Sequence, residues 1–201
     1  MNDGSRKLDV LIVGAGFAGL YMLLKARRQG LSARVVEAAA GIGGTWYHNR
    51  YPGARVDVQS MEYSFSFDDE LQQQWQWSER YAPQPELLRY ANHVADRFAL
   101  RDGIQLNTRI SGAHFDESTC RWRVFADSGE SWTARFLVLA SGPLAITKKR
   151  ADQLRLAWAA PGRISACTCQ RLASPSNQAP VMRVLSKMPS RSAKWSATWL
   201  A

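Results

Sequence analysis

Histidine, cysteine and long apolar runs are scarce in this sequence. Among 201 residues there are three histidines and three cysteines, Cys120, Cys167 and Cys169. An odd number of cysteines, at no metal-ligand spacing, argues against a disulfide framework or a zinc site and indicates free thiols in a reducing compartment. No apolar run approaches the length of a membrane span, and the first one begins too soon after Met1 for a signal peptide. We therefore expect a cytoplasmic protein with no membrane segment and no metal.

Acidic residues are missing from one part of the chain. The formal net charge is +9, yet residues 1–146 carry sixteen Lys and Arg against sixteen Asp and Glu. Residues 147–201 carry ten Lys and Arg against one acid, Asp152, and lack Glu, His, Phe and Tyr altogether. We expect this tail to be disordered, because it shows no helical or strand period and little that could form a core. The neutral balance of residues 1–146 argues against a nucleic-acid-binding surface on the folded domain.

A glycine-rich turn follows the first apolar run. Gly14, Gly16 and Gly19 come directly after the apolar residues 10–13 and open a helical pattern over residues 17–29. In a dinucleotide-binding unit, these glycines permit a tight turn, a close approach to the pyrophosphate and close packing of helix on sheet. The N–H groups at the start of the helix then face the phosphates. Glu37 ends the next apolar run, 18 residues after Gly19, where it can accept hydrogen bonds from a ribose.

The remaining pattern predicts an α/β domain. Apolar residues recur at helical spacing from Leu87 to Phe98, after Pro83. The period changes to two beyond residue 103 and predicts a β-meander, whereas residues 137–140 form the continuous apolar run of a buried central strand. The turn after this run, at Gly142, should approach the glycine-rich turn, because open α/β sheets bind ligands at the carboxyl ends of their strands. We expect an incomplete Rossmann-like FAD/NAD(P)-binding domain with a β-meander insertion, and an extended segment over residues 61–67.

Three further blocks give the sequence a family likeness. They read GGTWY at residues 43–47, YPGARVD at residues 51–57 and EYSFS at residues 62–66. Together with the glycine turn and Glu37, they resemble the N-terminal part of the Baeyer–Villiger flavin monooxygenases. The likeness covers about residues 8–146 and is most specific between Gly43 and Tyr63.

The resemblance implies that the dinucleotide is FAD, reduced by NADPH. Oxygen would be captured as a C4a-peroxyflavin that attacks a ketone to give an ester or lactone. The implied cofactor-binding residues are Gly14, Gly16, Phe17 and Gly19 at the pyrophosphate, Glu37 at the ribose, Gly44, Thr45 and Trp46 toward the flavin, Arg55, Asp57 and Tyr63 near the isoalloxazine and nicotinamide, Ile110 at the adenine, and Gly142. Asp57 is also the catalytic candidate, since its family counterpart orients an arginine.

The sequence departs from the family beyond residue 146. It has no second G-x-G-x-x-G turn for NADPH, no His- and Trp-containing signature and no counterpart of the catalytic arginine. We therefore expect the chain alone to be inactive, with Asp57 serving only to cap a turn. Our hypothesis is that residues 147–201 are not the native continuation and stem from a shifted reading frame.

Two alternatives stay open. One is an N- or S-oxygenating flavin monooxygenase. The other is a non-catalytic FAD- or nucleotide-binding module whose basic tail contacts an acidic partner. The sequence carries no signal for an oligomeric state.

Overall fold

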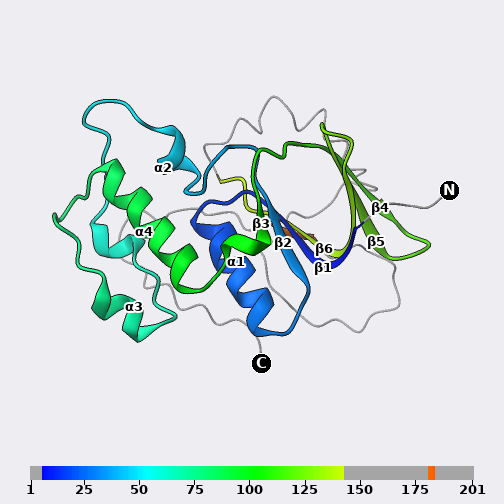
Figure 1. Ribbon diagram of the computed structural model, residues 1–201, viewed down its shortest axis with the longest axis horizontal. Helices are drawn as coiled ribbons and strands as arrows, with labels where there is room; N and C mark the ends of the chain where they lie inside the picture. Colours follow the sequence, from blue (N-terminus) through cyan, green and yellow to red (C-terminus); the bar gives the residue numbers. More distant parts are fainter. Residues whose placement is uncertain (1–5, 143–180, 184–201) are drawn as a thin grey trace, which may run out of the picture.

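The computed structural model describes residues 6–142 and 181–183 of the chain (Figure 1). The helices within these residues are α1 (Phe17–Arg28), α2 (Thr45–His48), α3 (Asp69–Gln74) and α4 (Gln84–Arg97), with two short 3-10 helices, η1 (Ser60–Tyr63) and η2 (Arg101–Gly103). The strands are β1 (Arg6–Val13), β2 (Ala33–Val36), β3 (Ile104–Gln105), β4 (Ile110–Asp116), β5 (Arg121–Ala126), β6 (Ser131–Leu139) and β7 (Val181–Arg183).

One mixed sheet runs through the domain in the order β3-β2-β1-β6-β5-β4. Neighbours among β3, β2, β1 and β6 are parallel, whereas β4, β5 and the start of β6 form an antiparallel meander. The meander is predicted to start directly beyond residue 103, and this start is wrong, because Ile104 and Gln105 pair with β2 and the meander begins at Ile110. Val13, the last residue of β1, pairs with Val36 on one side and Leu139 on the other. The carboxyl ends of three strands therefore meet at one edge, and the α/β fold predicted from the sequence is confirmed.

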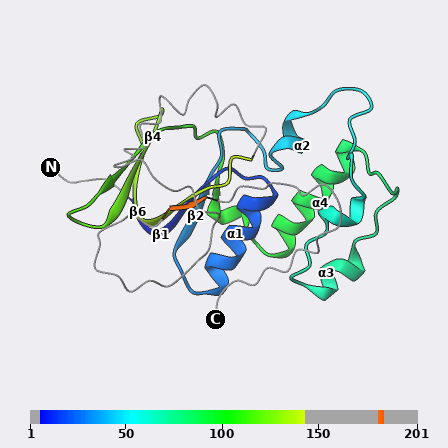
Figure 2. The same cartoon turned by 180° about the vertical axis from the view of Figure 1, so that it is seen from behind.

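Helix α1 covers one face of the sheet, and α4 lies beside it (Figures 1 and 2). The inward residues of α1 are Leu20, Leu23 and Leu24, which are buried in a cluster with residues of β1, β2 and α4. The helix ends at Arg28, and Gly30 turns the chain at a φ of +70° that favours glycine. The structure thus confirms the helix predicted after the glycine-rich turn.

The meander covers the opposite face. Strands β4 and β5 curl over the sheet (Figure 1), so that Trp122 and Val124 of β5 pack in one buried cluster with Leu11 of β1 and Val36 of β2. Trp132 and Leu137 of β6 complete this cluster and are almost fully buried. Both faces of the parallel strands are therefore protected from water, which accounts for their continuous apolar sequences.

Residues 45–98 form a second structural unit, here called the aromatic lobe. It is built around α3 and α4, to one side of α1 (Figure 2). Its centre is Tyr90 of α4, whose ring lies 5.0 Å from Trp77, 5.1 Å from Trp75 and 6.0 Å from Phe17. The extended segment predicted for residues 61–67 is wrong in its first part, because η1 turns the chain at residues 60–63. This turn places Tyr63 and Phe65 against Phe17.

The central strand β6 has a divided outer edge. Its first half pairs with β5, and Leu137–Leu139 pair instead with β7, parallel to them. The sequence predicts no strand beyond residue 146, so β7 is a correction, and its physical basis is the unpaired edge that β5 leaves on the second half of β6. The other predictions for the tail concern residues outside those described. Among the described residues, no helix is long and apolar enough to cross a membrane.

Candidate dinucleotide-binding site

The glycine-rich turn requires its glycines for two separate reasons. Gly14 has a φ of +106°, and a Cβ there would lie 2.7 Å from the carbonyl oxygen of Ala140. At Gly19 a Cβ would overlap the carbonyl oxygen of Gly14, so α1 could not approach the turn so closely. The turn that leaves β1 is consequently packed against both the start of α1 and the end of β6, as the sequence predicts.

The first turn of α1 is open to an anion. Gly16 caps the helix with extended backbone and without any side-chain hydrogen bond, and the first turn contains no acidic residue. The N–H groups of a first helical turn have no partner within the helix, and the positive end of the helix dipole lies there. A pyrophosphate would satisfy both needs.

Glu37 holds the glycine-rich turn in place. Its carboxylate accepts hydrogen bonds from the backbone N–H of Ala15 at 2.6 Å and of Ala39 at 2.8 Å. The side chain is 8% exposed, and the backbone of Glu37 is bonded to Gln105 and Thr108, which follow η2. The sequence predicts only a ribose-binding acid here. The structure adds a positioning role, and because each carboxylate oxygen has two lone pairs, capacity remains for ribose hydroxyls.

A second glycine pair lies against the first turn. The N–H of Gly43 donates to the carbonyl oxygen of Ala15 at 2.9 Å, and a Cβ on Gly44 would lie 3.0 Å from the Cα of Gly16. Gly44 adopts a φ of +57° and leads directly into α2, which begins at Thr45. The backbone at Gly16 and the backbone at Gly44 therefore face each other without side chains. A side chain on either glycine would fill the space that the pyrophosphate of a dinucleotide needs.

Trp46 and Tyr63 belong to the aromatic lobe and extend the site into it. Their ring centroids lie 5.7 Å apart, and Tyr63 lies 5.6 Å from Phe17 at the start of α1. Burial raises the pKa of the Tyr63 phenol, and the nearby carboxylate of Asp57 raises it further, while a hydrogen bond with Trp46 acts in the opposite direction. Asp57 itself is exposed. The structure thus brings Phe17, Trp46, Asp57 and Tyr63 together beside the glycine-rich turn.

Gly142 lies where the sequence predicts it. The N–H of Ala140 donates to the carbonyl oxygen of Val13 at 2.8 Å, and the Cα of Ser141 would lie 3.3 Å from a Cβ on Gly14. The turn that contains Gly142 is thereby held against the glycine-rich turn, and Gly142 itself is exposed at a φ of +77°.

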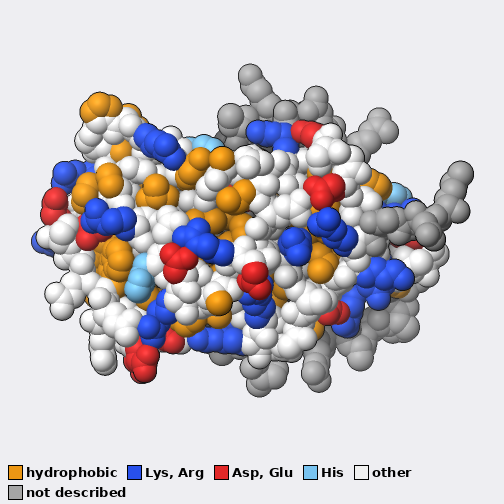
Figure 3. Space-filling view, in the orientation of Figure 1, with side chains coloured by type: hydrophobic (Ala, Val, Ile, Leu, Met, Phe, Trp, Pro, Cys, Tyr) orange, Lys and Arg blue, Asp and Glu red, His pale blue; other side chains and the backbone are white. Residues whose placement is uncertain are grey.

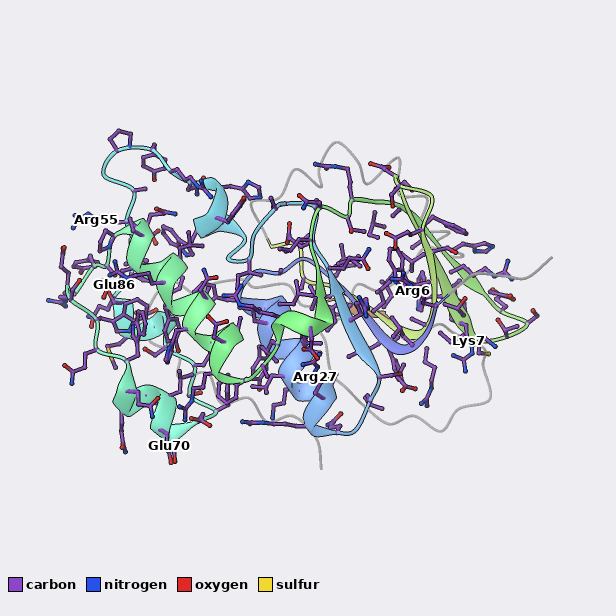
Figure 4. The ribbon with its side chains drawn as sticks, viewed as in Figure 1. Arg6, Lys7, Arg27, Arg55, Glu70 and Glu86 are labelled. Atoms are coloured by element: carbon purple, nitrogen blue, oxygen red, sulfur yellow. The ribbon has the colours of Figure 1, made fainter. Side chains whose placement is uncertain are left out.

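Two predicted site residues make their contacts away from the glycine-rich turn. Arg55 pairs with Glu79 at 3.2 Å and is half-exposed, so its guanidinium is directed to the loop before α4 (Figure 4). Ile110 opens β4 opposite Ala126 and packs against the cluster beneath the meander. Their cofactor contacts stay predictions.

Gln84 is a site residue that the sequence does not reveal. It is buried at the start of α4, and its side-chain amide donates to the carbonyl oxygen of Trp46, which ties α2 to α4. A glutamine between two prolines carries no pattern that distinguishes it from a surface residue. Among the described residues, no three His, Cys, Asp or Glu side chains lie close enough to hold a metal ion.

Comparison with known proteins agrees with this geometry. Residues 12–76 match the family described as the NAD(P)-binding Rossmann-like domain. The chain is 47% identical over 140 residues to a Baeyer–Villiger monooxygenase of Pseudooceanicola batsensis, covering 69% of this chain and 26% of the relative. It is 49% identical over 145 residues to the phenazine N-monooxygenase PhzNO1 of Lysobacter antibioticus, covering 72% and 27%.

Solved structures show the same relationship. An oxidized steroid monooxygenase bound to NADP is 57% identical and superimposes with a TM-score of 0.68, over 69% of this chain and 27% of that protein. The chain thus spans about a quarter of the length of the relatives it matches.

Proposed function

We propose a function from one premise: over 140 residues this chain is homologous to about a quarter of the length of a Baeyer–Villiger monooxygenase. On that premise, the described domain binds FAD and is the FAD-binding part of a flavin-dependent monooxygenase. The enzyme would use NADPH and O₂ to oxygenate a ketone or related carbonyl compound. We place this chemistry in the cytoplasm, in keeping with the three free-thiol candidates in the sequence.

One observation carries the FAD proposal: the bare backbone of Gly16 faces that of Gly44 at the uncapped start of α1, beside the buried Glu37. The residues present fit the cofactor. Amides of the first turn of α1 would receive the pyrophosphate, and Glu37 would receive the ribose while it keeps Ala15 in place.

Bound FAD would supply the electron transfer and oxygen chemistry that side chains lack. The protein side of the reaction then consists of binding and shielding. Phe17, Trp46 and Tyr63 form an apolar wall next to the glycine-rich turn, and such a wall keeps water from a reacting cofactor. Asp57 is exposed, and its carboxylate raises the pKa of Tyr63; it stays a candidate for orienting a partner group.

FAD binding by the full chain is the direct test. FAD should bind, whereas FMN, which lacks the adenosine monophosphate half and therefore the pyrophosphate, should bind far more weakly. Gly16→Ala should weaken FAD binding at least about tenfold, because the added Cβ fills the space beside Gly44 and blocks the close approach of the pyrophosphate. Isothermal titration measures both. The φ of Gly16 is −78°, which alanine adopts without strain, so the variant should still fold.

Gly112→Ala is the matched control. It adds the same methyl group to a glycine of β4 with open space around it, and FAD binding should not change. Equal binding of FAD and FMN, or unchanged FAD binding by Gly16→Ala, would contradict the proposal. We also propose that the FAD-loaded chain oxidises NADPH no faster than free FAD does, because the sequence lacks a second dinucleotide turn.

A second reaction class has specific support. The 49% identity with a phenazine N-monooxygenase is similar to the 47% identity with a Baeyer–Villiger monooxygenase and the 44% identity with an acetone monooxygenase. Oxygenation of a ring nitrogen in place of a carbonyl carbon is therefore the alternative for the complete enzyme. Both classes would share the FAD site described here.

A further inference from the structure

A hollow of about 460 Å³ lies on the aromatic lobe, next to the dinucleotide site. It lies between Arg50, two residues after the end of α2, and α4, and its walls are Arg50, Gln84, Pro85, Leu88, Arg89 and Asn92. In the space-filling view, Lys and Arg side chains lie beside hydrophobic ones at this end of the molecule (Figure 3). No acidic residue belongs to the walls, so the hollow has two cationic groups and no internal counter-charge.

Both arginines keep donors free. Among the described residues, the side chain of Arg89 has no hydrogen-bond or ion-pair partner. Arg50 uses only Nε, which donates to the carbonyl oxygen of Tyr47 at 2.8 Å, while its guanidinium stacks on the Tyr47 ring at 4.6 Å. This stacking fixes the guanidinium and leaves its two terminal nitrogens without a partner among the described residues. By contrast, Arg55 in the same lobe is paired with Glu79.

The remaining walls are held by hydrogen bonds. The amide of Asn92 donates to the carbonyl oxygen of Leu88 at 2.8 Å, and its Oδ1 accepts from Arg101 at 2.9 Å. Gln84 is nine-tenths buried and bonded to the backbone of Trp46. Leu88 and Pro85 add an apolar surface. The hollow therefore combines a fixed frame, an apolar wall and two free guanidinium groups.

We propose that this hollow binds a small phosphorylated molecule, with Arg50 and Arg89 contacting its phosphate group. Guanidinium groups match phosphate oxygens in paired hydrogen bonds, and such charge-assisted bonds are stronger than neutral ones. The volume lies within the range of small-molecule sites. Gln84 borders both sites, and Leu88 lies against Gly43, so the hollow adjoins the dinucleotide site. Neither Arg50 nor Arg89 is among the residues proposed to hold FAD, so phosphate binding by the two arginines does not depend on the FAD proposal.

The test is a titration of the ¹⁵N-labelled full chain with inorganic phosphate, followed in two-dimensional ¹H–¹⁵N spectra at constant ionic strength. Phosphate should shift the amide signals of Leu88, Arg89 and Asn92, together with the Nε signal of Arg50, and the shifts should saturate. Arg89→Gln should weaken this binding about tenfold, which is the loss of one charge-assisted contact. Arg89 is exposed, so the variant should fold normally.

Arg80→Gln is the matched control. Arg80 is also exposed and lies over an aromatic ring, that of Tyr81 at 5.7 Å, but outside the hollow. Its removal should leave the phosphate titration unchanged. Three results would each overturn the proposal: shifts that do not saturate or that chloride reproduces, equal effects of Arg89→Gln and Arg80→Gln, or saturable shifts confined to residues 16–19.

Discussion

The glycine-rich half of the domain and the aromatic lobe are stabilised by different kinds of contact. Around β1, α1 and β2, backbone lies on backbone, and glycines 14, 16, 19 and 44 set the spacing. In the aromatic lobe, large rings meet around Tyr90, and side chains bond to distant backbone: Tyr90 accepts from the N–H of Phe65 at 2.8 Å, and Glu86 accepts from Ser78. The first half has no room for a methyl group at Gly14 or Gly19, whereas the second depends on large side chains that fill its centre.

This difference also separates the two candidate sites. The pyrophosphate-binding part of the dinucleotide site is made of bare backbone beside one buried acid, so it offers N–H groups to a ligand. The hollow on the aromatic lobe offers arginine side chains instead. Both suit phosphate groups, and they reach that result by independent physical means.

The largest expected effect is in the glycine-rich half. Gly19→Ala adds a methyl group that overlaps the carbonyl oxygen of Gly14, and relief requires α1 to move from the sheet. We expect the free energy of unfolding to fall by about 3 kcal/mol, at the upper end of overpacking effects. Urea denaturation followed by circular dichroism measures this. Gly112→Ala adds a methyl group with open space around it and serves as the control. Equal stability of the two variants would contradict the tight packing of α1 on the glycine-rich turn.

A smaller effect is expected in the aromatic lobe. Glu86 is 3% exposed and accepts hydrogen bonds from the N–H of Ser78 at 2.9 Å and from its hydroxyl at 2.6 Å. Glu86→Gln keeps the shape but replaces one acceptor with a donor, which should cost about 2 kcal/mol. Ser78→Ala completes a double-mutant cycle, and the two losses should not add, because both variants break the same pair. Additive losses would show that the loop before α4 is held by other contacts.

The smallest effect is a dependence of stability on alkaline pH. Burial raises the pKa of Tyr90 from 10.0 to about 12, against a hydrogen bond from Phe65 that lowers it. The folded state therefore favours the protonated phenol, and the resulting stability is present below pH 10 and is lost as the pH rises toward 12. Unfolding curves at pH 9 to 12 should show the difference between the wild type and Tyr90→Phe shrinking with pH. A constant difference would mean that Tyr90 titrates normally.

The strand, turn and helix order could be predicted because it is local. Gly14, Gly19 and Glu37 occupy positions whose roles follow from distance along the chain, and the structure places all three at the carboxyl edge of the sheet. The buried run at residues 137–140 likewise predicted a central strand. Their contacts with a cofactor stay predictions, but their positions in the fold were accessible from the sequence.

The aromatic lobe was less accessible. The helical pattern of α4 predicts the buried Leu87 and Ala91, yet it does not predict that Tyr90 and Glu86 are buried as well. A tyrosine and a glutamate become core residues only when other segments supply partners, here the N–H groups of Phe65 and Ser78. No periodicity in α4 encodes partners that lie 8 and 25 residues away.

What the sequence alone determined is therefore the dinucleotide-binding order: an apolar strand, glycines at fixed spacing, an amphipathic helix and a closing acid. These features depend on backbone sterics and hydrophobic period, which act over a few residues. Only the tertiary structure decided that Glu37 pins the turn through Ala15, that Arg55 pairs with Glu79, and that Arg50 and Arg89 share one hollow. Each of these facts joins segments that are distant along the chain, and their meeting depends on how the whole domain packs.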